Sequence, residues 1–278
     1  LFRSTTKLLG EFRELSRTEG AKVADTGKVK DAVAAAPKQL EALYEVPYLA
    51  HAAMEPLNCA VKIDGDRCEI WTGTQFQTVD QMVAAKILGT TPDKVTIHTQ
   101  FLGGGFGRRA NPSSDFVSEA VIVAKAAGVP VKVVWTREDD TRGGYYRPAY
   151  VHRVAVGVDP AGNPAAWHHV VVGQSIIAGT SFEPFLVRDG VDGTSVEGVA
   201  DSPYLEAVAS KHVSLHSPRT PIPVLWWRSV GNTHTAFAME CMIDELAHAA
   251  GKDPLAYRLG LLGHNPRFVR ALETAASK

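Results

Sequence analysis

The chain has few cysteines, no long apolar run and no excess charge of either sign. Its 278 residues include three cysteines, Cys59, Cys68 and Cys241, without a CxxC pair, which argues against an iron–sulfur cluster or a zinc ribbon here. No apolar run approaches the roughly 18 residues of a membrane-spanning helix. The net charge of −1 argues against nucleic acid or an anionic membrane as the main partner.

Several catalytic and targeting signals are also absent. The chain has no Gly-x-Ser-x-Gly elbow and no convincing Ser/His/Asp set. It starts with Leu1 and runs into charged residues, so no signal peptide is visible. Because the sequence begins with Leu rather than Met, we expect a fragment, a processed product or an incomplete chain. Cys59 and Cys68 flank a hairpin; free thiols are expected, with a disulfide as the alternative.

Hairpins and helices alternate along the chain, which indicates an α+β fold with mixed sheets and flanking helices. Strand–helix–strand units around residues 71–136 predict some local parallel pairing. Residues 1–40 are expected to be a connector or a peripheral arm, and residues 41–278 one partial domain. Strands are expected at 60–63, 68–71, 94–99, 129–136, 150–158, 165–172 and 206–214. Helices are expected at 5–18, 28–36, 79–88, 113–127, 233–250, 253–262 and 268–277, with loops at 20–27 and 173–199.

The most informative segment is residues 103–109, which read Gly-Gly-Gly-Phe-Gly-Arg-Arg. A strand ending near Leu102 should precede it and a helix starting near Ser113, capped by Ser113 or Ser114, should follow it. Glycines let backbone N–H groups approach a ligand, and arginines suit phosphate. The segment is neither a Walker A loop nor a GxGxxG dinucleotide loop. It predicts an anionic ligand held by the backbone, with a tight structural turn as the alternative.

This loop resembles the glycine-rich loop of the molybdenum-binding large subunit in the xanthine dehydrogenase/aldehyde oxidase family. The Arg-Arg ending is similar to the isoquinoline 1-oxidoreductase and membrane-bound aldehyde dehydrogenase branch. Further segments resemble that subunit in the family's order, at residues 48–58, 71–75, 135–140, 146–148, 228–231, 244–247 and 253–255. The resemblance implies the fold of the molybdenum cofactor-binding domain of molybdenum hydroxylases, with this chain as a central fragment.

The resemblance also implies roles for particular residues. The cofactor would be bound by Gly103, Gly104, Gly105, Phe106, Gly107, Arg108 and Arg109. Gln75 would contact an oxo group of the metal, Phe106 would pack beneath it, and Arg228 would lie on the substrate side. The family more often has glycine at the position of Arg108. Each residue also has a plain structural reading: a surface glutamine, a loop plug and solvated arginines.

The implied activity is molybdenum-dependent oxidation of an aldehyde or N-heteroaromatic carbon, with water as the oxygen source. Ala110 stands where purine-hydroxylating members carry a glutamate, which argues against a xanthine-like substrate. The family's general base, a glutamate in a Gly-x-Gly-Glu motif, does not occur in the chain, so we expect the chain alone to be inactive. A non-catalytic cofactor-binding or assembly module is the alternative.

The resemblance further implies molybdopterin in its cytosine dinucleotide form. Partners would be the rest of the large subunit, a small [2Fe-2S] subunit and a cytochrome c electron acceptor. A bacterial periplasmic location is favoured, with the cytoplasm as the alternative. Three pairs of nearby residues contain histidine: His51/Glu55, His168/His169 and His212/His216. Metal binding by these pairs is not expected, because backbone or solvent partners are the default for histidine.

Overall fold

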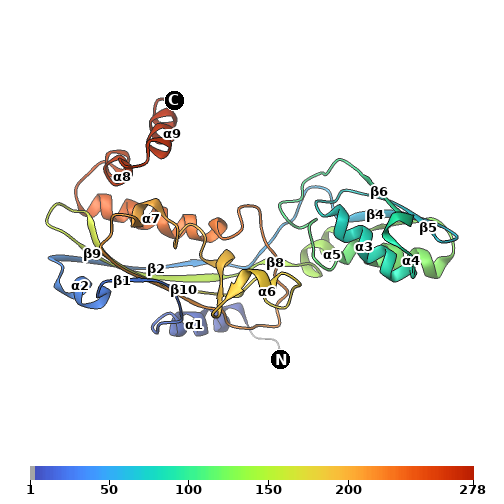
Figure 1. Cartoon of the computed structure of the whole chain (residues 1–278), viewed down its shortest axis with the longest axis horizontal. Helices are drawn as coiled ribbons and strands as arrows, with labels where there is room; N and C mark the ends of the chain where they lie inside the picture. Colours follow the sequence, from blue (N-terminus) through green and yellow to red (C-terminus); the bar gives the residue numbers. More distant parts are fainter. Residues whose placement is uncertain (1–3) are drawn as a thin grey trace. The chain divides into compact units, whose positions relative to one another are not determined.

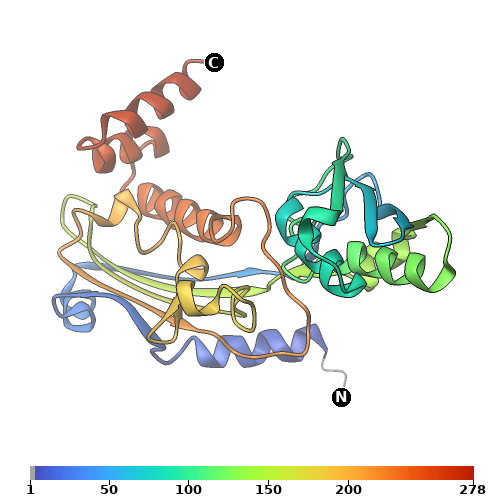
Figure 2. The ribbon, with the colours of Figure 1, turned by 45° about the vertical axis from the view of Figure 1, so that its right-hand side comes forward.

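The structure, a computed structural model, describes residues 4–278 and divides them into two compact units (Figures 1 and 2). Unit 1 consists of the chain up to Pro47, Pro148–Thr220 and Ser229–Lys278. Unit 2 consists of Tyr48–Arg147 and Pro221–Arg228. In the described part of the chain, no helix combines the length and apolarity needed to cross a membrane. The mixture of sheets and helices confirms the predicted α+β class.

Unit 1 is organised around a five-stranded sheet in the order β1-β13-β10-β9-β2. These strands are β1 (Ala21–Thr26), β13 (Ser210–His216), β10 (Pro164–Gly173), β9 (Tyr150–Val158) and β2 (Lys38–Val46). The pair β10 and β13 is parallel, and the other neighbours are antiparallel. The predicted hairpin between β9 and β10 is confirmed.

Helices cover both faces of this sheet (Figure 1). On one side lie α1 (Thr5–Leu15) and α2 (Val29–Ala35), and on the other lies α7 (Asn232–Ala249). The apolar face of α7 packs Met242, Ile243 and Leu246 against Val156 and Trp167 of the sheet. Two further helices, α8 (Pro254–Leu262) and α9 (Pro266–Ala276), follow it as predicted.

Two segments predicted as loops contain strands or helices. The segment 20–27 was predicted as a loop, but it contains β1, whose backbone pairs with the edge of β13. The segment 173–199 contains α6 (Glu183–Leu186), β11 (Val187–Arg188), β12 (Val191–Asp192) and the short 3-10 helix η2 (Gly193–Ser195). Another short 3-10 helix, η3 (Pro203–Leu205), precedes β13, which begins later than predicted. Short elements of this kind depend on pairing with distant chain, which local patterns do not encode.

The N-terminal segment also contributes to the core of unit 1. Residues 1–40 were expected to be a connector or peripheral arm, but β1 and the start of β2 lie in this segment. These two strands form the two edges of the five-stranded sheet. Leu8 and Phe12 of α1 are buried. The described residues from 4 to 40 are therefore an integral part of unit 1.

Unit 2 contains a four-stranded sheet in the order β6-β5-β4-β7. Its strands are β4 (Asn58–Asp64), β5 (Arg67–Thr72), β6 (Val95–Thr99) and β7 (Val131–Val134). The helices α3 (Gln77–Leu88) and α4 (Asp115–Ala127) pack side by side on this sheet. The unit is completed by η1 (Pro92–Lys94), α5 (Arg137–Arg142) and the short pair β3 (Leu49–Ala50) and β8 (Tyr146–Arg147). The predicted parallel pairing is confirmed, because β5 and β6 run parallel across α3.

The core between this sheet and its helices contains two of the cysteines. Cys59 and Cys68 are both buried, and both are free thiols, as expected. Their register partners across the hairpin are Thr72 and Ile63, not each other. Burial raises the pKa of the Cys59 thiol to about 12 and that of Cys68 to about 11, so both are protonated and unreactive near neutral pH.

Candidate functional site

The glycine-rich loop connects β6 to α4 in unit 2, as the sequence predicted. The strand ends at Thr99 and the helix begins at Asp115, so the connection is slightly longer than expected. Gly104 and Gly107 have φ values of 100° and 99°, and Phe106 has a φ of 54°. The expected side-chain cap at the start of α4 is wrong, because Ser114 sits at the N-cap in a left-handed conformation and makes no capping bond.

Arg109 fixes the shape of the loop from within the protein. Its guanidinium donates to the carbonyl oxygens of Gly104 at 2.9 Å, Gly73 at 3.1 Å and Glu55 at 3.0 Å. It also lies 3.0 Å from the Glu55 carboxylate, and the residue is only 1% exposed. A buried charge must be paired, and here one arginine joins the loop to the end of β5 and to the 53–55 segment.

Glu55 is the acidic partner in this arrangement. Its Oε2 atom accepts a hydrogen bond from the Gly103 N–H at 2.8 Å, and its Oε1 atom accepts one from Asn58 at 2.8 Å. Partial burial raises the pKa of Glu55, but these hydrogen bonds and the charge of Arg109 outweigh it and leave the pKa below its usual value. Glu55 is therefore ionised at neutral pH.

Arg108 is also engaged inside unit 2. Its guanidinium forms a two-pronged pair with Asp115, at 3.1 Å and 2.6 Å, at the first residue of α4. It lies over the rings of Trp135 and Tyr145, 5.7 Å and 5.3 Å from their centres. Both arginines thus have protein partners for their side chains, and direct contact of either with a phosphate stays a prediction.

The loop presents three successive backbone donors. The N–H groups of Gly103 and Gly107 bond to Glu55 and to Gln75. Among residues 4–278, those of Gly104, Gly105 and Phe106 have no hydrogen-bond partner. The φ angles along 104–106 alternate in sign, a backbone form that gathers N–H groups into an anion-binding concavity.

Gln75 lies directly against this loop. It follows β5, and its backbone N–H donates to the carbonyl oxygen of Arg109 at 3.0 Å. Its Oε1 atom accepts from the Gly107 N–H at 3.3 Å. A Cβ atom added at Gly105 would lie 2.6 Å from that Oε1, so glycine is needed there for Gln75 to keep its place. The Nε2 group of Gln75 donates to no protein atom within the described chain and is exposed.

Phe106 and Arg228 are joined through their backbones. The N–H of Arg228 donates to the carbonyl oxygen of Phe106 at 2.8 Å. The guanidinium of Arg228 is exposed and has no partner within residues 4–278. The Phe106 ring is 40% exposed and is parallel to the Trp227 ring, with 6.3 Å between centres. The structure therefore brings Gln75, Phe106 and Arg228 to the same loop.

Sequence reasoning missed the aromatic support behind this loop. Trp227 stacks on His51 at 4.6 Å between ring centres, so its ring neighbours both His51 and Phe106. His51 Nε2 lies 2.9 Å from the carbonyl oxygen of Trp226. Burial lowers the pKa of His51, which keeps the ring neutral. The spacing of His51 and Glu55 had raised only a question of metal binding, but each supports the loop through a different partner.

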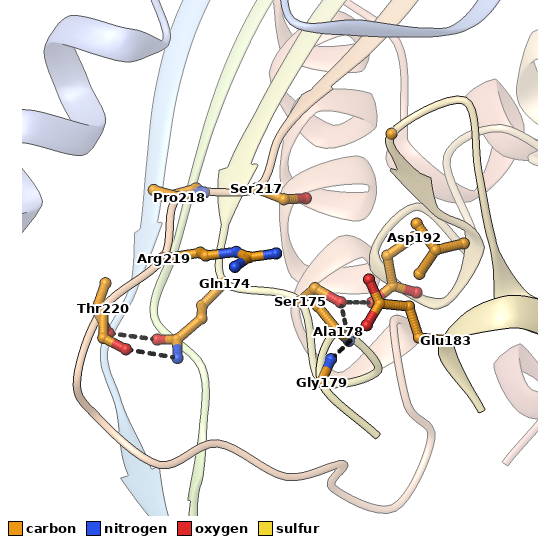
Figure 3. Close-up of a pocket in the computed structure, with 12 residues that line it drawn as sticks. Gln174, Ser175, Ala178, Gly179, Glu183, Asp192, Ser217, Pro218, Arg219 and Thr220 are labelled. Atoms are coloured by element: carbon orange, nitrogen blue, oxygen red, sulfur yellow. Dashed lines mark hydrogen bonds between the residues drawn. The ribbon is translucent and has the colours of Figure 1, made fainter. Parts of the chain in front are cut away.

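A second candidate site is a polar pocket of about 620 Å³ in unit 1 (Figure 3). Gln174 and Thr220 hydrogen-bond across one wall, and Ser175 donates to Asp192 at 2.5 Å on the other. The side chain of Arg219 extends into the pocket between these walls (Figure 3). Of the lining residues, all within the described chain, Arg219 is the one cation. No sequence motif pointed to this pocket.

Comparison with known proteins relates most of the chain to one family. Residues 14–260 match the family model described as "Molybdopterin cofactor-binding domain". Isoquinoline 1-oxidoreductase subunit beta of Brevundimonas diminuta is 32% identical over 86% of this chain and 29% of its own length. The membrane-bound aldehyde dehydrogenase of Gluconacetobacter polyoxogenes is 31% identical over 90% of this chain and 33% of its own length.

Solved structures share the fold at lower sequence identity. The aldehyde oxidoreductase of Desulfovibrio gigas matches with a TM-score of 0.68 at 20% identity, over 85% of this chain and 25% of that one. Quinoline 2-oxidoreductase of Pseudomonas putida 86 matches with a TM-score of 0.69 at 17% identity, over 85% of this chain and 30% of that one. The chain thus spans about a third or less of the proteins that it resembles.

Proposed function

This chain belongs to the molybdopterin cofactor-binding domain family, and we propose that residues 103–107 hold the phosphate side of the cofactor within a longer oxidoreductase subunit. The observation that carries the proposal is the set of three unpartnered N–H groups at Gly104, Gly105 and Phe106. Such a concavity binds phosphate oxygens through the backbone, without a dedicated cation. The residues present therefore fit an anionic cofactor.

Three side chains around the loop have separate tasks in this proposal. Gln75 would offer its free Nε2 as a neutral hydrogen-bond donor toward the metal end of the bound cofactor. Phe106, supported by Trp227, forms an apolar wall beside it. Arg228 presents an unpaired guanidinium, which stabilises negative charge on the substrate. Arg108 and Arg109 hold the loop in shape through Asp115 and Glu55, and contact of either with a phosphate of the cofactor remains part of the proposal.

When bound, the cofactor supplies two-electron oxidation of a carbon, with water as the oxygen source. We propose an aldehyde or an N-heteroaromatic compound as the substrate, because the two relatives above are named for these reactions. Since no Gly-x-Gly-Glu motif occurs in the chain, the general base would come from another part of the subunit. The cytosine dinucleotide form, a small [2Fe-2S] subunit and a cytochrome c acceptor belong to the same proposal.

The loop assignment can be tested by NMR on the purified chain. We would titrate ¹⁵N-labelled protein with cytidine 5′-diphosphate, a probe that carries the pyrophosphate and the base. The amide signals of Gly104, Gly105 and Phe106 should shift together and saturate. In Gly105→Ala, the added methyl group displaces the Gln75 side chain. The dissociation constant obtained from these shifts should then rise at least tenfold. Gly260→Ala is the control, because a Cβ there meets nothing within 4 Å.

Other outcomes would overturn the assignment. Saturable shifts confined to Arg219 and its pocket would place anion binding in unit 1. Equal affinity in Gly105→Ala would show that loop geometry is not used. The two candidate functions are separated in the complete enzyme by measuring molybdenum, released cytidine monophosphate and substrate turnover. An active hydroxylase contains the cofactor and turns over substrate, whereas a cofactor-binding module contains the cofactor and has no activity.

A further inference from the structure

Two histidines and a glutamate converge on the sheet of unit 1, away from the glycine loop. His168 on β10 and His212 on β13 are register partners in the parallel pair, and their rings stack with 5.4 Å between centres. Glu19 comes from the connection between α1 and β1. Its carboxylate oxygens lie 3.7 Å from His168 Nε2 and 4.0 Å from His212 Nε2. One ligand atom from each residue lies within 4.8 Å of the others.

The two ring nitrogens that face Glu19 are buried and lack hydrogen-bond partners. This holds for Nε2 of both His168 and His212 within the described residues. His212 is 8% exposed, so water does not replace the missing bonds. Two neighbouring buried acceptors or donors without partners are costly, and native proteins rarely leave them so. The arrangement therefore points to a ligand between them.

Asp25 fixes which nitrogen of His212 is available. Its Oδ1 atom lies 3.2 Å from His212 Nδ1, which places the proton on Nδ1 and the lone pair on Nε2. A carboxylate that accepts from the far nitrogen of a histidine is the usual outer partner of a metal-bound imidazole. The lone pair of His212 is thus directed toward Glu19 and His168.

We propose that Glu19, His168 and His212 bind a divalent transition metal of the zinc type. Two imidazoles and one carboxylate form a donor set that suits zinc and leaves a fourth position for water. Tetrahedral ligands about 2.0–2.1 Å from zinc are separated by roughly 3.3 Å. The imidazole nitrogens lie 3.7 Å and 4.0 Å from the two different carboxylate oxygens, and the three ligand atoms lie within 4.8 Å of one another, so side-chain rotations that draw the three groups together close the site.

Lys30 is the competitor of the ion. Its Nζ atom lies 2.6 Å from Glu19 Oε1 and supplies the positive charge that a metal would bring. The Lys30 side chain is 71% exposed, so it can swing into solvent when an ion binds. The ion would tie the connection between α1 and β1 to β10 and β13. This site does not depend on the proposed cofactor function, because all its residues lie in unit 1.

Calorimetric titration of the metal-free 278-residue chain with ZnCl₂, without an affinity tag, tests the site. The wild type should bind one equivalent in a saturable step and gain thermal stability in Zn²⁺. His168→Gln and His212→Gln should each weaken binding at least tenfold, and Lys30→Ala should tighten it. His248→Gln is the control, because His248 is exposed and lies on α7.

Co²⁺ provides a second readout that does not depend on stability. The wild type should give the intense absorption of tetrahedral Co²⁺. The variant Glu19→Gln, altered at an exposed position, should lose this absorption while keeping its circular dichroism spectrum. The proposal is overturned if Zn²⁺ does not bind saturably. It is also overturned if the affinity is unchanged in both His168→Gln and His212→Gln, which would place the ion elsewhere.

Discussion

The backbone N–H of Arg228 donates to the backbone carbonyl oxygen of Phe106 at 2.8 Å. The bond joins the glycine-rich loop to the 221–228 segment, and both belong to unit 2 although the chain passes through unit 1 between them. Because this bond uses only backbone atoms, neither side chain is consumed by it. The ring of Phe106 stays beside Trp227, and the guanidinium of Arg228 stays free for a ligand.

Replacing Arg228 should therefore affect substrate more than stability. In the complete enzyme, Arg228→Gln should lower kcat/KM for an aldehyde or N-heteroaromatic substrate by about 10- to 100-fold, the range of one charged hydrogen bond. The free energy of unfolding should change by less than about 0.5 kcal/mol, as for other exposed side chains. Steady-state kinetics and urea unfolding measure the two effects.

The exposed Arg267 supplies the matched control for that substitution. Arg267→Gln removes the same charge from α9 and should change neither quantity. If Arg228→Gln keeps full kcat/KM, or if it destabilises unit 2 strongly, the substrate-facing role of Arg228 is wrong.

The loop needs glycine at position 107 for two separable reasons. Gly107 has a φ of 99°, and a Cβ there would lie 2.9 Å from the carbonyl oxygen of Trp226. Gly89 has a φ of 75° but nothing within 4 Å of such a Cβ. Gly89→Ala should cost about 1 kcal/mol from backbone strain alone, and Gly107→Ala clearly more, about 2–4 kcal/mol. Urea unfolding of the two variants measures the difference between them, which is the cost of the contact with Trp226. Equal losses in the free energy of unfolding would show that this contact has no effect.

Removing the Arg109 charge should disorder the loop. Arg109→Met leaves three carbonyl oxygens and the Glu55 carboxylate without their donor, and a broken buried pair typically costs about 3–5 kcal/mol. Hydrogen exchange should then rise at 103–109 and in the 53–55 segment. The double variant with Glu55→Gln should recover part of the loss, since it removes the uncompensated charge. A double variant as unstable as the sum of both single changes would contradict the pairing.

A buried histidine chain in unit 1 should make stability depend on pH. His152 is fully buried and lies between His169 and His234. Its Nδ1 atom is 2.9 Å from Nε2 of His169, and its Nε2 atom is 2.9 Å from Nδ1 of His234. Burial lowers the pKa of His152 from 6.5 to about 3. Below pH 6.5 the unfolded chain therefore binds a proton on this histidine and the folded chain does not. The contribution of His152 to the free energy of unfolding is fully present above pH 6.5 and is lost as the pH falls toward 3.

Between pH 7.5 and pH 5 this single group should remove about 2 kcal/mol from the free energy of unfolding. Urea titrations at both pH values measure the change. His152→Leu should reduce the slope below pH 6.5 by up to about 1.4 kcal/mol per pH unit. His248→Gln, altered at an exposed histidine of α7, should keep the wild-type slope. Identical slopes in wild type and His152→Leu would show that His152 is not the titrating group.

The longer helices of this protein were predictable because their signals are local. Gly89 and Gly128 end α3 and α4 in the left-handed region, next to the predicted helix ends at 88 and 127. The hairpin between β4 and β5 turns at residues 64–67, where Gly65 has a positive φ. These features depend on neighbours within a few residues, so the sequence pattern is sufficient.

The strands that were not predicted lack such local signals. The segment of β1 has no hydrophobic alternation of its own, and it is a strand because β13 offers an unpaired edge. Within the site, the sequence pointed to the loop but not to its supports. His51 precedes the loop within unit 2, whereas residues 148–220 of unit 1 separate Trp226 and Trp227 from both along the sequence, so only the fold brings these aromatic side chains to the loop.

By itself, the sequence determined the α+β class, most helix positions, the glycine loop between a strand and a helix, and the family resemblance. The tertiary structure alone decided that Arg108 and Arg109 turn inward to Asp115 and Glu55, that three loop amides stay free, and that Glu19, His168 and His212 meet. The physical reason is the sequence separation between the residues that interact. Turns and helix caps are set by neighbouring residues, whereas the pairing of buried charges is set by which distant groups the folded chain brings within a few ångströms.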